Sequence, residues 1–168
     1  SEGEELQVGF CISGIRPKSF KLKEPKIGDK LILTKPLGTG VILAANMRKK
    51  INPKEYETTI KTMLSSNLNA ANILKKENIT AITDVTGFGL ARHTLNLTKP
   101  FGAKFNMKNL PVISGAIEHL SHDINSSLAF SNKKAINFTS NISKEDHIIF
   151  DPQTSGGLLV SVNKIKAK

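Results

Sequence analysis

The stretch Ile82–His93, which reads ITDVTGFGLARH, constrains the fold more than any other part of the chain. A short apolar run, Ile79–Ile82, leads into it, and apolar residues at helical spacing follow from Leu90 onward. Two glycines stand between the apolar run and this helical pattern, and glycine adopts the positive φ angles that tight turns need. The stretch therefore predicts a strand, a tight turn and a helix in direct succession.

The residue types in this turn predict a cation site beside an anion site. Asp84 stands at the end of the predicted strand, and strand ends hold a side chain rigidly at the sheet edge where ligands bind. Mg²⁺ binds one or two carboxylates together with waters and substrate phosphates, so Asp84 is a candidate metal ligand. Thr86 has a hydroxyl that can cap the helix, and Gly87 lets a phosphate approach unpaired backbone N–H groups. The alternative is that Asp84 and Thr86 are only capping residues and the glycines only form the turn.

Length and composition predict a protein of one domain. A chain of 168 residues buries roughly 70% of its unfolded surface, so it needs neither a disulfide nor a metal to fold. No apolar run approaches the roughly 20 residues that cross a membrane, and the first residues lack the pattern of a signal peptide, so we expect a cytoplasmic protein. Cys11 has no cysteine partner, and we expect it to be buried in a strand, Gln7–Ile15. Because the sequence begins with Ser1, we expect it to be cut from a longer chain.

The net charge of +10 raises nucleic-acid binding as an alternative, because Lys and Arg neutralise phosphates. The basic residues are mostly lysines scattered along the chain, without interleaved aromatic residues for base stacking. This distribution argues against a nucleic-acid partner, and a basic tRNA-binding domain stays a minor alternative. His119, His122 and His147 lack metal-ligand spacing, which argues against a zinc site. We interpret His93 as a packed or solvated helical residue.

Apolar periodicity predicts alternating strands and helices over the rest of the chain. The predicted strands are Gln7–Ile15, Lys30–Thr34, Ile79–Ile82, Ala103–Met107 and Leu158–Val162. The predicted helices are Val41–Met47, Lys54–Lys76, Leu90–Leu97 and Val112–Leu120. Together they indicate an α+β domain in which a mixed β-sheet is covered by α-helices.

The longest predicted helix, Lys54–Lys76, follows Pro53, a residue that suits the first turn of a helix. Its apolar residues fall on one stripe, which predicts that it is the main core helix. The stripe consists of Tyr56, Ile60, Met63, Leu64, Leu68, Ala71 and Leu74. Asn67 lies on the same stripe, where it either satisfies a backbone group or faces a ligand. Residues 121–147 are polar and predict a long surface excursion with at most a short strand near Ala135–Phe138.

Two further glycine loops allow an anion-binding or a purely structural interpretation. Thr34–Gly40, TKPLGTG, runs into a predicted helix, a geometry that suits an anion and to which Lys35 adds a positive charge. Because the loop has no Walker A pattern, a plain strand-to-helix connection is favoured. Asp151–Gly157, DPQTSGG, offers hydroxyls and bare backbone N–H groups, but its composition favours a simple turn.

Three of these stretches together resemble one family. TKPLGTG at 34–40, TDVTGFG at 83–89 and DPQTSGGLL at 151–159 are similar to segments in the carboxy-terminal half of the selenophosphate synthetases, also called selenide, water dikinases. They occur in the family's order and spacing, and the resemblance extends over nearly the whole chain. The wider superfamily, which includes aminoimidazole ribonucleotide synthetase, shares the fold.

The resemblance implies an activity and a site. The family converts ATP, selenide and water to selenophosphate, AMP and phosphate, which supplies selenium for selenoproteins and for modified tRNA. Its members use ATP and Mg²⁺, and Asp84 matches the family's Mg²⁺-binding aspartate. By the same match, Thr86 and Gly87 lie near the transferred phosphate. Arg92 stands where the family usually has glycine, which implies either altered helix packing or a contact to phosphate.

The resemblance also implies that half of the enzyme is absent from this sequence. The family's amino-terminal half carries the glycine-rich nucleotide segment, a reactive cysteine or selenocysteine with its lysine, and further metal-binding aspartates. We therefore expect residues 1–168 to form one domain, the C-terminal half of a two-domain enzyme, with no catalytic residue of its own and no activity alone. Its expected partner is its own N-terminal ATP-binding domain, through which the complete protein forms a homodimer. The alternative is a stand-alone nucleotide- or anion-binding module of the same superfamily.

Overall fold

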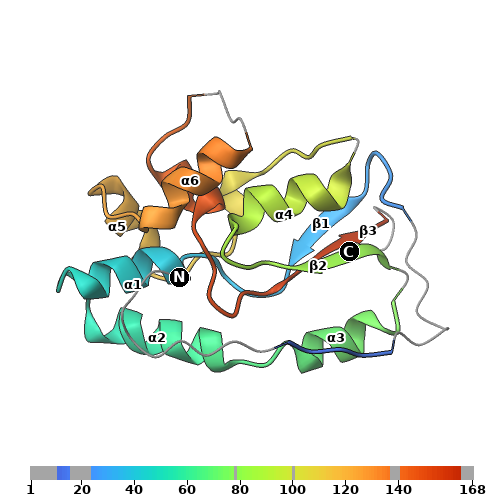
Figure 1. The fold of residues 1–168 in the computed structure, drawn as a ribbon, viewed down its shortest axis with the longest axis horizontal. Coiled ribbons are helices and arrows are strands. Elements are labelled where there is room, and N and C mark those ends of the chain that lie inside the picture. The colour runs from blue at the N-terminus through green and yellow to red at the C-terminus, as the bar shows by residue number, and fades with distance from the viewer. Residues whose placement is uncertain (1–10, 16–23, 78, 100, 137–140, 164–168) are drawn as a thin grey trace.

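The chain is described from a computed structural model, which covers residues 11–15, 24–77, 79–99, 101–136 and 141–163 in detail. Helices separate the three strands of one small sheet along the described chain (Figure 1). This arrangement confirms the expected α+β class. In chain order the elements are β1 (Lys30–Leu33), α1 (Thr39–Met47), α2 (Pro53–Leu64), α3 (Leu68–Leu74), β2 (Ile79–Asp84), α4 (Gly89–Thr98), the 3₁₀ turn η1 (Met107–Asn109), α5 (Ala116–Ser121), α6 (Ser127–Ala135), the 3₁₀ turn η2 (Glu145–Phe150) and β3 (Leu158–Val162).

The sheet has the strand order β1-β3-β2. β3 pairs antiparallel with both neighbours, placing Leu159 opposite Leu33 and Leu158 opposite Asp84. The described strands are therefore antiparallel rather than mixed, and the parallel pairing that the structure shows is an isolated bridge between Leu37 and Val112. Because β1 and β2 run in the same direction on either side of β3, their C-terminal ends lie together beside the start of β3.

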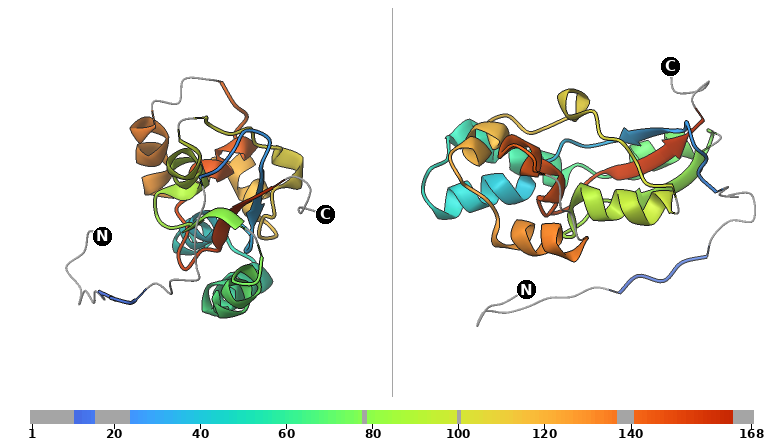
Figure 2. Two further views of the ribbon diagram at one scale, coloured as in Figure 1. Left: turned by 90° about the vertical axis from the view of Figure 1, so that its right-hand side faces the viewer. Right: turned by 90° about the horizontal axis from the view of Figure 1, so that it is seen from above.

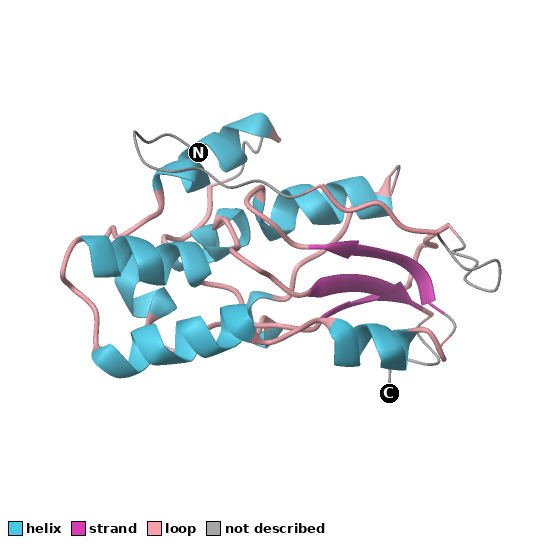
Figure 3. Cartoon of the chain, turned by 60° about the horizontal axis from the view of Figure 1, so that its bottom comes forward, coloured by secondary structure: helices cyan, strands magenta, loops and turns pink. Residues whose placement is uncertain are grey.

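Helices enclose the sheet and extend beyond it. α4 lies over one face and α3 along the other, while α1, α5 and α6 gather past the end of the strands (Figures 1 and 2). The larger core cluster lies between α4, α1 and η2 and includes the fully buried Leu37, Ile42, Leu90 and Phe150. A smaller cluster forms where Leu74 of α3 packs against the opposite face of the sheet. The apolar core therefore continues from the sheet into the helical half of the molecule. Figure 3 shows the strands toward one end and helices extending past them.

The predicted single helix over Lys54–Lys76 is wrong, because α2 ends at Leu64 and α3 starts at Leu68. The intervening polar residues hydrogen-bond outside a helical pattern: Ser66 Oγ accepts the Leu68 N–H at 3.1 Å, and Asn67 Nδ2 donates to the Gly156 carbonyl at 2.9 Å. The Ser66 bond is local and competes with the helix, whereas the Asn67 bond ties this segment to a residue 89 positions away. The predicted stripe is also not the main core, since Leu64 is 80% exposed and Leu68 is 60% exposed.

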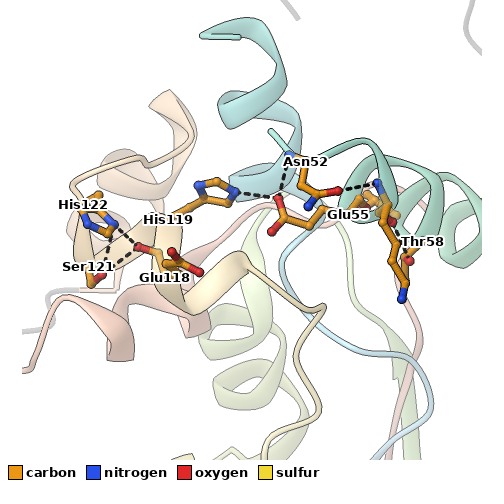
Figure 4. A network of polar contacts seen from close by, with 9 residues as sticks. Asn52, Glu55, Thr58, Glu118, His119, Ser121 and His122 are labelled. Carbon is orange, nitrogen blue, oxygen red and sulfur yellow. Dashed lines mark hydrogen bonds and ion pairs between the residues drawn. The ribbon is translucent and has the colours of Figure 1, made fainter. Parts of the chain in front are cut away.

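The start of α2 agrees with the prediction from Pro53 and adds a capping box. Asn52 Oδ1 accepts the Lys54 N–H at 2.9 Å, and Glu55 Oε2 accepts the Asn52 N–H at 3.2 Å. The same Glu55 oxygen lies 3.0 Å from His119 Nε2 on α5 (Figure 4). This one carboxylate therefore satisfies a helix end and also joins α2 to α5.

Three other sequence-based predictions differ from the structure. Ala103–Met107 is not a strand, because the sheet of the described residues consists of β1, β3 and β2 and this segment pairs with none of them. Apolar alternation does not form a strand without such pairing. The helix predicted over Val112–Leu120 begins only at Ala116. Cys11 is exposed rather than buried, and residues 11–15 form neither a strand nor a helix. The rest of the predicted first strand, 7–10, lies outside the described residues.

The polar segment 121–147 is more ordered than expected, because it contains α6 and the first part of η2. α6 buries little apolar surface, with Ala129 as its buried residue, so apolar periodicity did not reveal it. The strand predicted near Ala135–Phe138 is wrong at Ala135, which belongs to α6, and the positions from 137 lie outside the described residues. Within the described part of the chain, no helix has the length and apolar character needed to cross a membrane.

Candidate functional site

The three glycine loops meet at one end of the sheet. They follow β1, follow β2 and precede β3, and the antiparallel pairing brings these three points together. The Thr34 N–H donates to the Leu158 carbonyl at 3.0 Å, and the Val85 N–H donates to the Gly157 carbonyl at 2.9 Å. We call these loops, residues 34–40, 84–89 and 151–157, the motif corner.

The first and third loops of the motif corner are joined at the start of α1. Gln153 Oε1 accepts the Gly38 N–H at 3.1 Å and the Thr39 hydroxyl at 3.3 Å. Asp151 Oδ2 accepts the Gly40 N–H at 3.1 Å. Side chains of this chain therefore occupy the donors at this helix end that an anion would use. The structural interpretation of TKPLGTG is favoured over an anion site for this reason.

Asp151 is a buried acid in the motif corner. Burial raises its pKa to about 7, although Gln153 Nε2 and the Gly40 N–H donate to Oδ2 and oppose the shift. Its other oxygen, Oδ1, is buried without a hydrogen-bond partner in the described part of the chain. Desolvation disfavours the charged carboxylate more than these donors favour it, so the group titrates near neutral pH.

Two glycines let the loops approach more closely than other residues would. A Cβ at Gly156 would collide with the Val85 carbonyl oxygen of the second loop. Gly89 has a φ of 77°, and a Cβ there would lie 2.8 Å from the Phe150 carbonyl oxygen. The glycines of TDVTGFG and DPQTSGG therefore pack loop against loop, in addition to forming turns.

Lys35 lies inside the motif corner rather than beside it. Its side chain is 8% exposed, and Nζ donates to the Ser155 carbonyl at 2.8 Å. Burial lowers the pKa of its ammonium group, as expected for a cation removed from water. The side chain thus connects the first loop to the third.

Asp84 is the exposed last residue of β2, where its carboxylate is available to a ligand. The structure gives this carboxylate no hydrogen bond or ion pair with any other described residue. The described residues also contain no group of three or more His, Cys, Asp or Glu side chains that could hold a metal ion. Asp84 therefore fits Mg²⁺ as one carboxylate among waters, phosphate oxygens and other ligands.

Thr86 does not cap α4, which corrects the expectation from the sequence. α4 begins at Gly89 with Phe88 as its N-cap and has no side-chain cap. The Thr86 N–H instead donates to His93 Nε2 at 3.1 Å, and the Thr86 hydroxyl lies 3.0 Å from the same nitrogen. α4 starts too late for the Thr86 hydroxyl to reach the N–H groups that a cap would satisfy.

His93 belongs to the candidate site, although sequence reasoning assigned it no role there. Burial lowers the pKa of His93, and the nearby Asp84 carboxylate partly opposes this shift. Because Nε2 accepts the Thr86 N–H, the neutral ring carries its proton on Nδ1. The available signal was position: side chains in the first turns of a helix lean back toward its N-terminus and reach the preceding loop.

Gly87 lies at the exposed tip of the turn, and a Cβ there would meet nothing within 4 Å. Asn132 Nδ2 on α6 donates to the Gly87 carbonyl at 2.8 Å. The N–H groups of Gly87 and Phe88 have no hydrogen-bond acceptor among the residues described. The sequence offered no local signal for Asn132, because it lies 45 positions from Gly87.

Arg92, which replaces the glycine usual in the resembled family, contacts α6 instead of the turn. Its guanidinium donates to the Ala135 carbonyl at 3.2 Å, and the side chain is otherwise exposed. Of the two interpretations from the sequence, this contact favours altered helix packing. A cavity of about 390 Å³ adjoins Arg92, and it is lined by residues of α4 and the end of α6.

One cavity is separate from the candidate site. It has a volume of about 1080 Å³ and lies between β1, α4 and the segment 101–110. Its lining includes Leu33 and Leu90 but none of Asp84, Thr86 and Gly87. Asp84 and Gly87 are exposed and Thr86 is half-buried, so the candidate groups lie at the surface and not in this cavity.

Comparison with known proteins identifies the family to which this chain belongs. Residues 26–168 match the family described as AIR synthase related protein, C-terminal domain. A selenide, water dikinase from Campylobacter jejuni is 35% identical over 167 residues, which cover 97% of this chain and 49% of that protein. Proteins of the same name from Caldanaerobacter subterraneus and Treponema denticola are 38% and 37% identical, over 99% and 94% of this chain and 51% and 47% of theirs. The chain spans about half the length of these curated relatives, and it belongs to the family of AIR synthase related proteins, C-terminal domain.

Proposed function

We propose that this chain is the C-terminal domain of a selenide, water dikinase, which makes selenophosphate, AMP and phosphate from ATP, selenide and water. One observation carries the proposal: three loops distant in sequence converge beside the exposed Asp84, whose carboxylate has no described protein partner. The similarity to curated proteins of that name supports the same activity. Glycines that served only as turn residues would have no reason to bring these three loops together.

In this proposal Asp84 contributes one ligand to Mg²⁺. The bound metal neutralises charge on the phosphates during transfer. The Thr86 hydroxyl and the backbone at Gly87 contact phosphate oxygens, which fits the exposed position of this turn. No residue of the chain is assigned as an acid, base or nucleophile.

The domain requires a partner to complete the site. Phosphoryl transfer depends on positioning and on metal ions held by several ligands, and the described residues contain no cluster of three or more such side chains. We propose that an N-terminal domain of the same protein binds ATP and provides the remaining groups, and that the complete enzyme is a cytoplasmic homodimer. The chain alone is then inactive.

The decisive experiment measures AMP formation from ATP, with and without selenide, by the complete protein and its Asp84→Asn variant. Loss of this carboxylate should reduce activity by at least the roughly 10–100-fold seen for outer-shell changes at metal sites. Asp123→Asn is the matched control, because Asp123 is exposed and its carboxylate pairs with Lys144 on the surface, away from the motif corner. Thermal unfolding of each variant checks that it is folded.

The outcomes separate the proposal from its alternatives. Selenide-dependent AMP formation that fails only in Asp84→Asn supports both the activity and the metal role. Full activity of Asp84→Asn would contradict the metal role, and AMP formation without selenide dependence would contradict the activity. Binding of Mg²⁺-ATP by the isolated chain would favour a stand-alone nucleotide-binding module instead.

A further inference from the structure

The Thr86–Gly87 peptide has its orientation fixed from inside the motif corner. The Thr86 carbonyl accepts the Gly89 N–H at 3.0 Å and the Gln153 N–H at 3.1 Å. In a planar trans peptide, the C=O and N–H bonds point in opposite directions. The Gly87 N–H therefore points away from Gln153.

The next peptide, Gly87–Phe88, is fixed from outside the corner by α6. Asn132 Nδ2 donates to the Gly87 carbonyl at 2.8 Å and to the Phe150 carbonyl at 3.0 Å. Two carbonyl acceptors require that this side-chain atom be the NH₂ group, which has two hydrogens to donate. By the same planarity, the Phe88 N–H points away from Asn132.

We propose that Asn132 is a positioning residue for the phosphate site, and that the Phe88 N–H joins the Gly87 N–H in binding a phosphate oxygen. This inference rests on the function proposed above. Both N–H groups lack a described acceptor, and both stand just ahead of the first turn of α4, where the helix favours an anion.

Asn132 is needed because it supplies the hydrogen bond that the structure gives to the Gly87–Phe88 peptide from the described residues. Gly87 has no close neighbour where a Cβ would be, and Phe88 is 65% exposed. A glycine without such restraint reaches other backbone conformations at little cost. Asn132 also ties this peptide to Phe150, which immediately precedes the DPQTSGG loop, so it links the second and third loops from a different helix.

The test uses the complete protein with Asn132→Ala and Asn132→Asp. Alanine removes both donors, and aspartate keeps the shape but brings a carboxylate against two carbonyl oxygens. Asn96→Ala is the control, because Asn96 is exposed on α4 and its side chain has no hydrogen bond or ion pair among the described residues. Asn132→Ser, which keeps a single donor, provides a milder variant if the others fold poorly.

Two measurements distinguish positioning from simple structural support. The first measures KM for ATP and kcat separately in AMP formation. We expect KM to rise about tenfold or more, as for other outer-shell residues. The second is hydrogen–deuterium exchange of the peptide 84–90, with and without Mg²⁺-ATP. Wild type and Asn96→Ala should gain protection with nucleotide, and the Asn132 variants should lose that gain.

Two results would overturn the inference. One is that folded Asn132 variants have the same KM for ATP as the wild type and gain the same protection from exchange when nucleotide binds. The other is a lower melting temperature and lower kcat without any change in KM or protection, because a purely structural residue would act that way. Failure of the proposed function is distinguishable, since it appears in the wild type as AMP formation that does not depend on selenide.

Discussion

Gln153 accepts the Gly38 N–H through its side-chain oxygen, although the two residues are 115 positions apart. The same amide group donates through Nε2 to the Asp151 carbonyl and carboxylate, both at 2.9 Å. One buried side chain therefore satisfies the start of α1 and orders the third loop. The candidate site depends on this contact, because it holds the first and third loops beside the turn that carries Asp84.

Gln153→Ala should lower the free energy of unfolding substantially. It leaves the buried N–H of Gly38 without its acceptor, and an unsatisfied buried group costs about 1–3 kcal/mol. Chemical denaturation of wild type and variant measures the difference. Thr154→Ala is the control, since this neighbouring side chain is exposed; equal losses in both variants would contradict the role of Gln153.

Asp151 should make stability depend on pH in an unusual direction. Its pKa in the folded state is raised from 3.8 to about 7, so the folded protein binds a proton more tightly than the unfolded chain does. This contribution is fully present below pH 4 and is lost as the pH rises through 7, by at most roughly 4 kcal/mol. Melting temperatures across this range should therefore fall more steeply in wild type than in Asp151→Asn. Parallel curves would show that Asp151 is already ionised when folded.

Gly156→Ala and Gly87→Ala should differ sharply. At Gly156 the added methyl group collides with the Val85 carbonyl, and overpacking of this kind costs about 1–3 kcal/mol or more. At Gly87 the methyl group meets open space, so stability should change little. Melting temperatures of the two variants compare them directly, and equal values would contradict the close approach of the second and third loops.

His93→Leu and His93→Gln should separate the acceptor role of His93 from its packing. Leucine leaves the Thr86 N–H without an acceptor, whereas the glutamine side chain can offer its amide oxygen. We expect kcat/KM for ATP to fall about tenfold or more with leucine, as for outer-shell residues, and to recover in part with glutamine. Equal activity of the two variants in AMP assays would show that only the bulk of His93 matters.

The local sequence was enough to predict β1, α1, the strand–turn–helix around Asp84, and β3. Each of these elements contains a run of apolar residues with a glycine or proline close to one end, and such signals act between near neighbours. The residue types of the turn also identified Asp84 as a candidate ligand before any contact was known. The break between α2 and α3 was missed because Ser66 and Asn67 bond to groups that helical periodicity does not include.

The sequence by itself thus determined the strands, α1 and α4, and it identified the loops that are proposed to carry the chemistry. Only the tertiary structure decided that the loops meet, because the antiparallel pairing of β3 with both β1 and β2 brings three distant segments together. It also decided which backbone groups remain free, since Gln153, His93 and Asn132 occupy some donors and acceptors and leave others open. Hydrogen bonds between residues far apart in the chain produce no periodic pattern in the sequence. They can therefore be identified only from the folded structure.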